Sequence, residues 1–265
     1  MAAPIRLDEP PTPGAVPPQL GHRWDERRAW ITHYFDRTAS AAWAKLTSDA
    51  PVSGIRRTVR EGREQMRRTL SSWLPADLAG ARVLDAGCGP GVFAMELAAR
   101  GAHVVAVDVS PTLVGLAQER AEGQAGAGRI DWRVGDMLDP AHGTFDYVVA
   151  MDSLIHYPAA EIAAALAALA GRTEHGIVGT FAPGTPLLRV MRGVGRLFPQ
   201  GDRAPAIEPV LEGTLRRRLA ADPAMHDWRW TRTERVRRGF YTSQAVELRR
   251  EGRSDGAFPS SGQEH

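Results

Sequence analysis

The residues best suited to chemistry lie in a glycine-rich segment, V-L-D-A-G-C-G-P-G, at residues 83–91. Gly87 and Gly89 can adopt positive φ and allow the backbone to approach a ligand closely. A helix predicted to begin at Gly91 adds free N–H groups and the positive end of a dipole, which suit a carboxylate as well as a phosphate. Cys88, between the glycines, is interpreted as a small side chain that fills the turn and not as a nucleophile.

Two positions in this segment distinguish between nucleotide ligands. A dinucleotide fingerprint requires a small residue where this chain has Val92, and Asp85 would repel a pyrophosphate. An NAD-binding oxidoreductase is therefore a disfavoured alternative. S-adenosylmethionine carries an ammonium, a carboxylate and a cationic sulfur, which together suit one acidic side chain beside one helix N-terminus. We therefore predict that S-adenosylmethionine is the cosubstrate and that it binds Asp85 and the glycine turn.

Acidic residues also follow the next two predicted strands. Asp108 ends a strand at residues 103–108, where a carboxylate binds the ribose hydroxyls in doubly wound sheets. Val109 follows it and is assigned to the same site. Asp136 is placed to accept from the adenine amino group, and Met137 to pack on the adenine ring. Each aspartate alone is as compatible with a strand-end turn or a helix cap, but acidic residues at consecutive strand ends beside the glycine turn indicate a binding site.

The acceptor side of the reaction is predicted in M-D-S-L-I-H-Y-P, residues 151–158, which follows the fourth strand. Residues at this carboxyl end of a parallel sheet face the bound ligand. Met151 and Asp152 are assigned to the cosubstrate, and His156 and Tyr157 are candidates to meet the methyl acceptor. A loop histidine that binds a backbone carbonyl is the ordinary alternative for His156. No His, Cys and Asp residues show the spacing of a metal site, so no protein-bound metal is predicted.

The elements that must position these residues alternate between strand and helix, which predicts a parallel sheet with right-handed crossovers. The expected fold is α/β, a Rossmann-like class I methyltransferase with a mostly parallel seven-stranded sheet and an antiparallel last strand. Strands are expected at residues 82–85, 103–108, 130–134, 147–151, 176–181, 228–236 and 238–244, and helices at residues 91–100, from Ser110, and at 159–170, 186–198 and 208–220.

The remaining segments suggest four parts along the chain. Clustered prolines in residues 1–24 predict a disordered arm. Residues 25–75 form two predicted helices that could cover the site as a lid. The methyltransferase domain is expected at residues 80–250, with an insertion at about residues 184–208, and a disordered tail at residues 251–265.

Composition excludes several classes of protein. The chain has 33 basic and 31 acidic residues, a net charge of +2, which argues against a nucleic-acid partner. A competing nucleic-acid role would use five arginines near the C-terminus, whose alternation along a strand is more simply a solvated face: Arg229, Arg232, Arg235, Arg237 and Arg238. A single cysteine excludes an internal disulfide and fits the cytoplasm. There is no apolar run of the roughly 20 residues that span a bilayer, and no signal-peptide core.

Between about residues 31 and 249 the chain resembles the magnesium-protoporphyrin IX O-methyltransferases of bacteriochlorophyll synthesis, in their purple-bacterial form. The matching segments are Y-F-D-R-T-A (34–39), R-x-T-V-R-E-G-R (56–63), S-W-L-P (72–75), M-D-S-L-I-H-Y-P (151–158), F-A-P-G-T-P-L-L (181–188), G-R-L-F-P (195–199) and R-G-F-Y-x-S (238–243). The chain departs from the chlorophyll-type members at residues 200–205, so no roles are transferred there.

The resemblance implies methyl transfer from S-adenosylmethionine to one propionate of magnesium protoporphyrin IX, giving a monomethyl ester. It places Tyr34 and His156 at the acceptor, although His156 could instead touch the porphyrin magnesium. It also implies contact with the magnesium chelatase large subunit and at most peripheral association with the photosynthetic membrane. Another small hydrophobic acceptor, such as a quinone precursor or a fatty acid, is the alternative.

Overall fold

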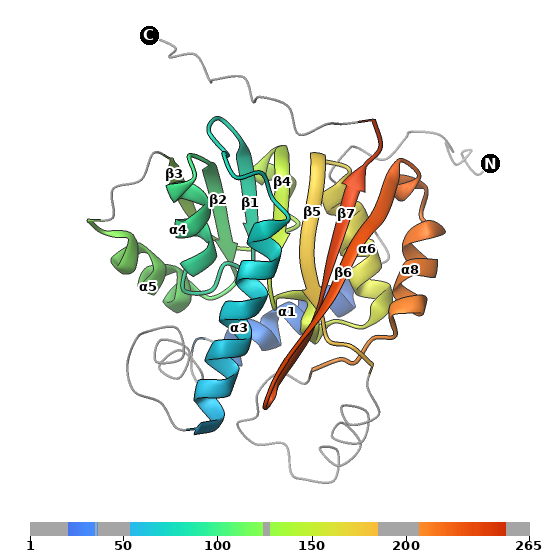
Figure 1. Ribbon diagram of the computed structural model, residues 1–265, viewed down its shortest axis with the longest axis horizontal. Helices are drawn as coiled ribbons and strands as arrows, with labels where there is room; N and C mark the ends of the chain where they lie inside the picture. Colours follow the sequence, from blue (N-terminus) through green and yellow to red (C-terminus); the bar gives the residue numbers. More distant parts are fainter. Residues whose placement is uncertain (1–20, 35, 37–53, 124–127, 185–206, 253–265) are drawn as a thin grey trace, which may run out of the picture.

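A mixed β-sheet forms the centre of the computed structural model, which describes residues 21–34, 36, 54–123, 128–184 and 207–252. The strand order within this described part is β3-β2-β1-β4-β5-β7-β6 (Figure 1). Five strands run parallel: β1 (Arg82–Ala86), β2 (His103–Asp108), β3 (Arg129–Val134), β4 (Phe145–Ala150) and β5 (Thr173–Phe181). Strand β7 (Tyr241–Arg250) pairs antiparallel with both β5 and β6 (Trp228–Arg238). This arrangement confirms the predicted fold class.

The helices follow the strands as the sequence pattern predicts. They are α1 (Gly21–Tyr34), α3 (Gly54–Ser72), α4 (Val92–Ala99), α5 (Pro111–Ala121), α6 (Ala159–Ala170) and α8 (Glu212–Ala220), with short 3-10 helices η2 (Pro140–His142), η3 (Leu154–His156) and η4 (Pro223–Met225). Helix α5 illustrates why the start of a helix can be predicted from the sequence. The Ser110 hydroxyl accepts a hydrogen bond from the Leu113 N–H at 3.2 Å, and Pro111 occupies the first turn.

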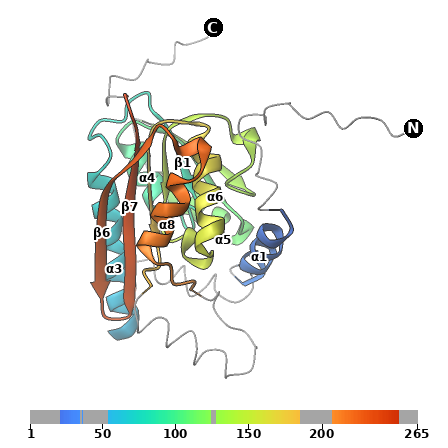
Figure 2. The same ribbon diagram turned by 90° about the vertical axis from the view of Figure 1, so that its right-hand side faces the viewer.

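Two apolar clusters cover the two faces of the sheet, because successive residues of a strand point to opposite sides. Val83 and Tyr147 face the cluster that contains Met66 and Leu70 of α3. Leu84 and Ala86 face the cluster that contains residues of α6 and α8. Figure 1 shows α3 lying across the front of the sheet, and Figure 2 shows α6, α8 and α1 together on one side of β7.

Several predicted boundaries are wrong, and three of them differ most from the structure. Helix α1 begins at Gly21, inside the predicted arm, because Trp24 is buried at 1% exposure and is part of the core. Strand β7 continues past Gln244 to Arg250; its buried Glu247 interrupts the apolar pattern, and its charge is balanced by arginines on β6 and β7. Helix α8 starts at Glu212 and not at residue 208, because the preceding residues pair with other loops. The helix predicted at residues 186–198 and most of both predicted disordered ends lie outside the described residues.

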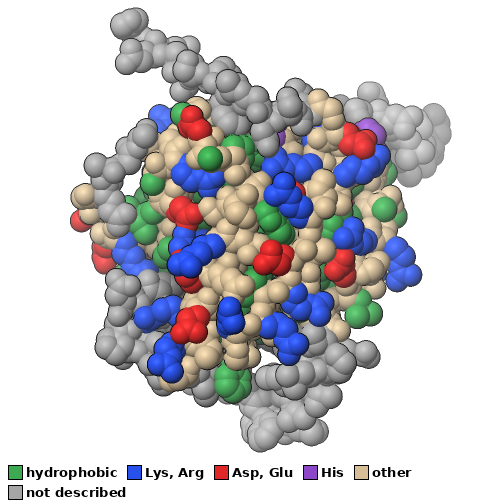
Figure 3. Space-filling view, viewed as in Figure 1, with side chains coloured by type: hydrophobic (Ala, Val, Ile, Leu, Met, Phe, Trp, Pro, Cys, Tyr) green, Lys and Arg blue, Asp and Glu red, His purple; other side chains and the backbone are tan. Residues whose placement is uncertain are grey.

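The arginines of β6 belong to a mixed surface. Arg232 pairs with Glu247 at 3.2 Å, Arg229 pairs with Glu251 at 2.6 Å, and Arg235 donates to Gln244 at 2.8 Å. Figure 3 shows acidic side chains interspersed with the basic ones on the face that α3 and β6 form. These pairings favour the solvated-face interpretation. Among the described residues, no helix combines the length and the apolar character needed to cross a bilayer.

Candidate functional site

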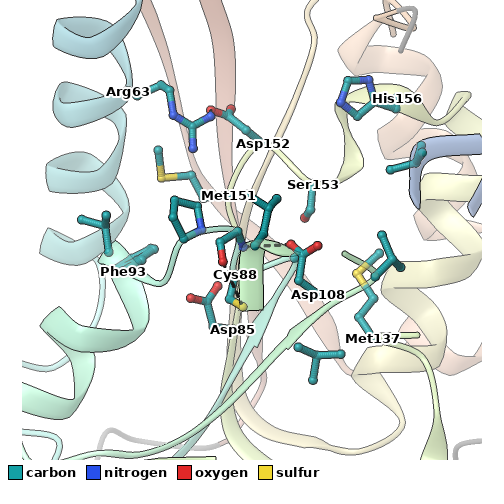
Figure 4. A pocket seen from close by; sticks show the side chains of 18 of the residues that line it. Arg63, Asp85, Cys88, Phe93, Asp108, Met137, Met151, Asp152, Ser153 and His156 are labelled. Atoms are coloured by element: carbon teal, nitrogen blue, oxygen red, sulfur yellow. Dashed lines mark hydrogen bonds and ion pairs between the residues drawn. The ribbon is translucent and has the colours of Figure 1, made fainter. Parts of the chain in front are cut away.

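A cavity of about 520 Å³ opens at the carboxyl ends of β1, β2 and β4 (Figure 4). Parallel strands bring these ends to one edge of the sheet, so residues far apart in the sequence meet there. Twelve of the predicted site residues line the cavity: Asp85, Gly87, Cys88, Gly89, Asp108, Val109, Asp136, Met137, Met151, Asp152, His156 and Tyr157. The glycine turn, the acidic strand ends and the segment after β4 therefore form one site.

The glycine turn depends on backbone freedom at two positions. Gly87 has φ of 82°, and a Cβ there would lie 2.3 Å from the Ser153 Cβ, so a side chain would collide with the segment after β4. Gly91 has φ of 77° and caps α4, and a Cβ there would lie 2.4 Å from the Trp132 ring. The described residues that line the cavity do not include Gly91. Its geometry is thus explained by packing and by the start of α4.

Asp85 lies at the floor of the cavity with 2% exposure. Burial, followed by repulsion from Asp108, raises the pKa of its carboxyl to about 7, although a hydrogen bond from the Ala94 backbone acts the other way. One of its oxygens, Oδ2, is buried with no hydrogen-bond partner among the described residues. Such an atom costs free energy unless a ligand supplies a donor. The ammonium of S-adenosylmethionine has the charge and the donors that this oxygen lacks.

Cosubstrate binding is therefore expected to depend on pH. Below about pH 7 the carboxyl of Asp85 is mostly protonated and cannot pair with an ammonium, so affinity should fall by up to roughly tenfold per pH unit and binding should release protons. Calorimetry between about pH 6 and pH 8, in buffers of different ionisation enthalpy, measures both effects. Asp85→Asn should remove the fall in affinity below about pH 7, whereas titration of the ligand's own α-ammonium near pH 8 should remain. Equal wild-type affinity across this range would contradict the pairing.

Asp108 is held in place by the turn it faces. Its Oδ2 accepts from the Gly89 N–H at 2.8 Å, and its Oδ1 accepts from the Ser110 N–H at 2.9 Å. Burial raises the pKa of this carboxyl, and these backbone hydrogen bonds oppose the rise. A carboxylate has about four lone-pair sites, so two backbone donors leave capacity for further donors such as ribose hydroxyls.

Asp136 is in contact with helix α1. The Trp24 indole donates to its Oδ2 at 2.9 Å, and Arg28 lies 3.5 Å from the same oxygen. The Trp24 ring stacks on Tyr157, with centroids 4.4 Å apart. Arg27 donates to Glu161 and to the backbone carbonyl of His156. Helix α1 is thus attached to the groups that are predicted to receive the adenine and the acceptor.

Asp152 has φ of 55°, a left-handed conformation at the end of β4. Arg63 donates to its Oδ2 at 2.6 Å, and Tyr241 and Ser243 donate to its carboxylate at 3.1–3.2 Å. Its backbone N–H donates to the Thr180 hydroxyl. The predicted contact of Asp152 with the cosubstrate stays a prediction; the side chain in this structure ties α3, β5 and β7 to the cavity.

The two residues predicted at the acceptor are placed differently. His156 is buried at 8% exposure, within η3, and lines the cavity. Tyr34 is half-buried at the end of α1, and burial raises the pKa of its hydroxyl. The described residues that line the cavity include Trp24, Arg28 and Ile31 of the same helix but not Tyr34. Both acceptor roles stay predictions.

Sequence reasoning missed the basic wall of the cavity. Helix α3 contributes four arginines to it, Arg60, Arg63, Arg67 and Arg68. Arg60, Arg63 and Arg67 are separated by three and four positions, the spacing that places side chains on one face of a helix. That spacing was the available signal. Within the described ranges, no group of three or more His, Cys, Asp or Glu side chains is placed to hold a metal ion.

Comparison with known proteins relates the chain to a methyltransferase family. A model described as magnesium-protoporphyrin IX methyltransferase C-terminus matches residues 150–250, and one described as methyltransferase domain matches residues 83–176. The magnesium-protoporphyrin O-methyltransferase of Rhodobacter capsulatus is 49% identical over 225 residues, 84% of this chain and 97% of that protein. The corresponding Synechocystis protein is 34% identical over 171 residues, 64% of this chain and 74% of that protein.

Solved structures agree with the sequence relatives. The crystal structure of magnesium protoporphyrin IX methyltransferase from Synechocystis PCC 6803 with bound SAH superposes with a TM-score of 0.72. The two chains are 29% identical, and the match covers 84% of this chain and 99% of that one. With the cavity, the buried carboxylates and these matches taken together, the chain belongs to the magnesium-protoporphyrin O-methyltransferase family.

Proposed function

We propose that the protein transfers a methyl group from S-adenosylmethionine to one propionate of magnesium protoporphyrin IX, giving the monomethyl ester and S-adenosylhomocysteine. The observation that carries this proposal is that two matched segments meet in one cavity. Asp85 and Asp108 come from the part of the chain that matches the general methyltransferase model, and the stretch from Met151 to His156 lies where the family-specific model matches as well.

The reaction needs alignment more than proton transfer. A propionate has a pKa near that of Glu, about 4.3, so it is anionic at neutral pH and needs no base. Its oxygen bonds to the methyl carbon as the methyl–sulfur bond breaks, and the sulfur keeps the electron pair. Opposite charges are neutralised, so a site that excludes water favours the transition state. Holding the two reactants in line contributes about 7–11 kcal/mol.

The residues of this chain would supply that alignment. Asp85, Asp108 and Asp136 would hold the cosubstrate at its ammonium, ribose and adenine. His156, from the opposite side of the cavity, would aim the propionate by hydrogen bonding, with Tyr34 brought to it when α1 moves. Support comes from the burial of His156 and from its place after β4, where the strand ends face the ligand.

Residues 25–75 are proposed to act as a lid, and the contacts of the two helices favour a motion of the first one. Helix α1 buries Trp24 and Ile31 in the core, and it is also held by polar contacts that the ligand would replace, such as the bond from Trp24 to Asp136, a group that the adenine amino would also use. Helix α3 buries Met66 and Leu70 completely in the core. The part of the lid that opens should therefore be α1.

Hydrogen exchange is expected to show this motion. Amides of α1 should exchange quickly in the free protein and slowly with S-adenosylhomocysteine and magnesium protoporphyrin bound, because a flat acceptor must enter a site that later excludes water. Amides around Met66 and Leu70 should change little and serve as the internal control. Equal protection of α1 in the two states would refute the lid.

We further propose that the magnesium chelatase large subunit delivers the acceptor and that the protein associates at most peripherally with the photosynthetic membrane. A large hydrophobic acceptor diffuses poorly through water, which favours direct transfer between proteins or at a membrane surface. A pull-down of the chelatase subunit and flotation with anionic vesicles test the two contacts separately.

The function is tested by methyl transfer from labelled S-adenosylmethionine. Magnesium protoporphyrin should accept the label at one carboxylate. Metal-free protoporphyrin tests whether recognition of the acceptor depends on its magnesium ion. A quinone precursor and a fatty acid serve as competing acceptors. Transfer to either of these with magnesium protoporphyrin inactive would overturn the proposal.

A further inference from the structure

Charges of opposite sign are segregated within the cavity. The described residues that line it include five arginines and five carboxylates. Asp85, Asp108 and Asp136 lie at the strand ends that are proposed to hold the cosubstrate, whereas four of the five arginines lie on α3. The lining carboxylate on α3 itself is Glu64, which pairs with Arg67 and Arg68 and leaves that wall with an excess of positive charge. In Figure 4, Arg63 and His156 stand on opposite sides of the cavity, with Asp85 at its far end. The cavity therefore has an acidic end and a basic wall.

This segregation matches the charges of the two reactants. S-adenosylmethionine has a net charge of +1 from its ammonium, sulfonium and carboxylate, and magnesium protoporphyrin carries two propionates. Only one propionate is methylated, so the other remains an anion throughout the reaction. The basic wall is the part of the cavity that can bind it.

Arg63 is fixed in orientation by the residues around it. Its Nη1 donates to Asp152 at 2.6 Å, and Asp152 is itself held by Tyr241 and Ser243. The arginine side chain is 20% exposed, so it is largely enclosed while facing the cavity. A guanidinium has five N–H donors in a planar fork, so one guanidinium can bind more than one carboxylate. Arg60 lies one helical turn earlier on the same lining face.

We propose that Arg60 and Arg63 form a subsite for the carboxylate that is not methylated. The inference rests on the proposed function. An arginine on the reacting carboxylate would oppose methylation, because its attraction is lost as the anion becomes a neutral ester. On the other carboxylate the same attraction is equal before and during transfer. It therefore tightens binding and sets which propionate points at the methyl group, without raising the barrier.

The experiment compares two acceptors. One is magnesium protoporphyrin, and the other is a magnesium porphyrin with a single propionate and an ethyl group in place of the second, used as both regioisomers. Arg60→Gln should raise KM for the diacid about tenfold, with kcat unchanged, since the lost contact is partly exposed. KM for the monoacid should not change. Arg57→Gln is the matched control, because it removes the same charge from an exposed position of α3 outside the cavity lining.

Removing Arg63 would leave the Asp152 carboxylate buried without its cation, so the second variant is Arg63→Lys, which keeps the charge but not the planar fork. A rise in KM confined to the diacid, in either variant, supports the subsite. Unchanged KM in both variants, an equal rise with both acceptors, or the same rise in Arg57→Gln overturns it. Failure of the wild-type protein to methylate magnesium protoporphyrin would instead reject the proposed function.

Discussion

Asp108→Ala is expected to weaken binding of S-adenosylmethionine at least a hundredfold. The carboxylate would lose two charged hydrogen bonds to ribose hydroxyls, each contributing about 1.5–3 kcal/mol. The variant also removes the acceptor of the Gly89 N–H, at 2.8 Å, so the turn that carries the ligand becomes less well defined. Calorimetric titration with S-adenosylhomocysteine, which has the same ribose, measures the effect without turnover.

Asp77→Ala is the control for this substitution. Asp77 is exposed and accepts from a backbone N–H in a turn, as Asp108 does, but lies outside the cavity lining. Its replacement should leave the affinity nearly unchanged. If folded Asp108→Ala binds as tightly as the wild-type protein, Asp108 has no part in the site.

His156→Ala is expected to lower turnover by about a hundredfold while affinity for S-adenosylhomocysteine stays near that of the wild-type protein. A lost positioning contact has an effect of this size. His156 lines the acceptor side of the cavity and is separate from the glycine turn, so its replacement should not alter the affinity for the cosubstrate. Tyr34→Phe should act in the same direction if α1 brings the hydroxyl to the acceptor. Single-turnover methyl transfer, with binding measured separately, checks both variants.

His156→Gln and His156→Asn separate orientation from base catalysis. Both side chains donate a hydrogen bond, and neither can take a proton as a base. Substantial activity in either variant is expected, because the propionate is already an anion. Activity as low as that of His156→Ala, with the acceptor bound normally, would show that orientation is not the role of His156.

The strand ends could be predicted because their signals are local. The strand at His103–Asp108 was predicted with its observed limits, since buried parallel strands have continuous apolar runs. The glycine turn was identified because its glycines lie close together in sequence. Strand β7 was shortened in the prediction because Glu247 breaks its apolar pattern, and the two arginines that balance this buried charge cannot be read from the strand itself.

The residues missed at the site depend on packing between distant segments. Trp24 was predicted at the boundary between the arm and the first helix. Its burial follows from stacking on Tyr157, a residue too distant in sequence for a local pattern to indicate the contact. In the sequence, Arg63 is one of several charged residues of α3, and nothing nearby indicates its role, because its partner Asp152 is 89 positions away. In contrast, Asp108 was found because the switch-point rule fixes where its strand end must lie.

The order of strands also bears on how such enzymes diverge. Asp85, Asp108 and Asp136 lie on the side of the sheet encoded before residue 150, and β4 adjoins β1 at the boundary where the family-specific match begins. Most of the proposed cosubstrate residues thus precede the stretch that contains His156, whereas Tyr34, Arg60 and Arg63 of the proposed acceptor side come from helices that precede both stretches. A change of acceptor can therefore arise from substitutions on either side of the nucleotide-binding stretch while that stretch itself is retained.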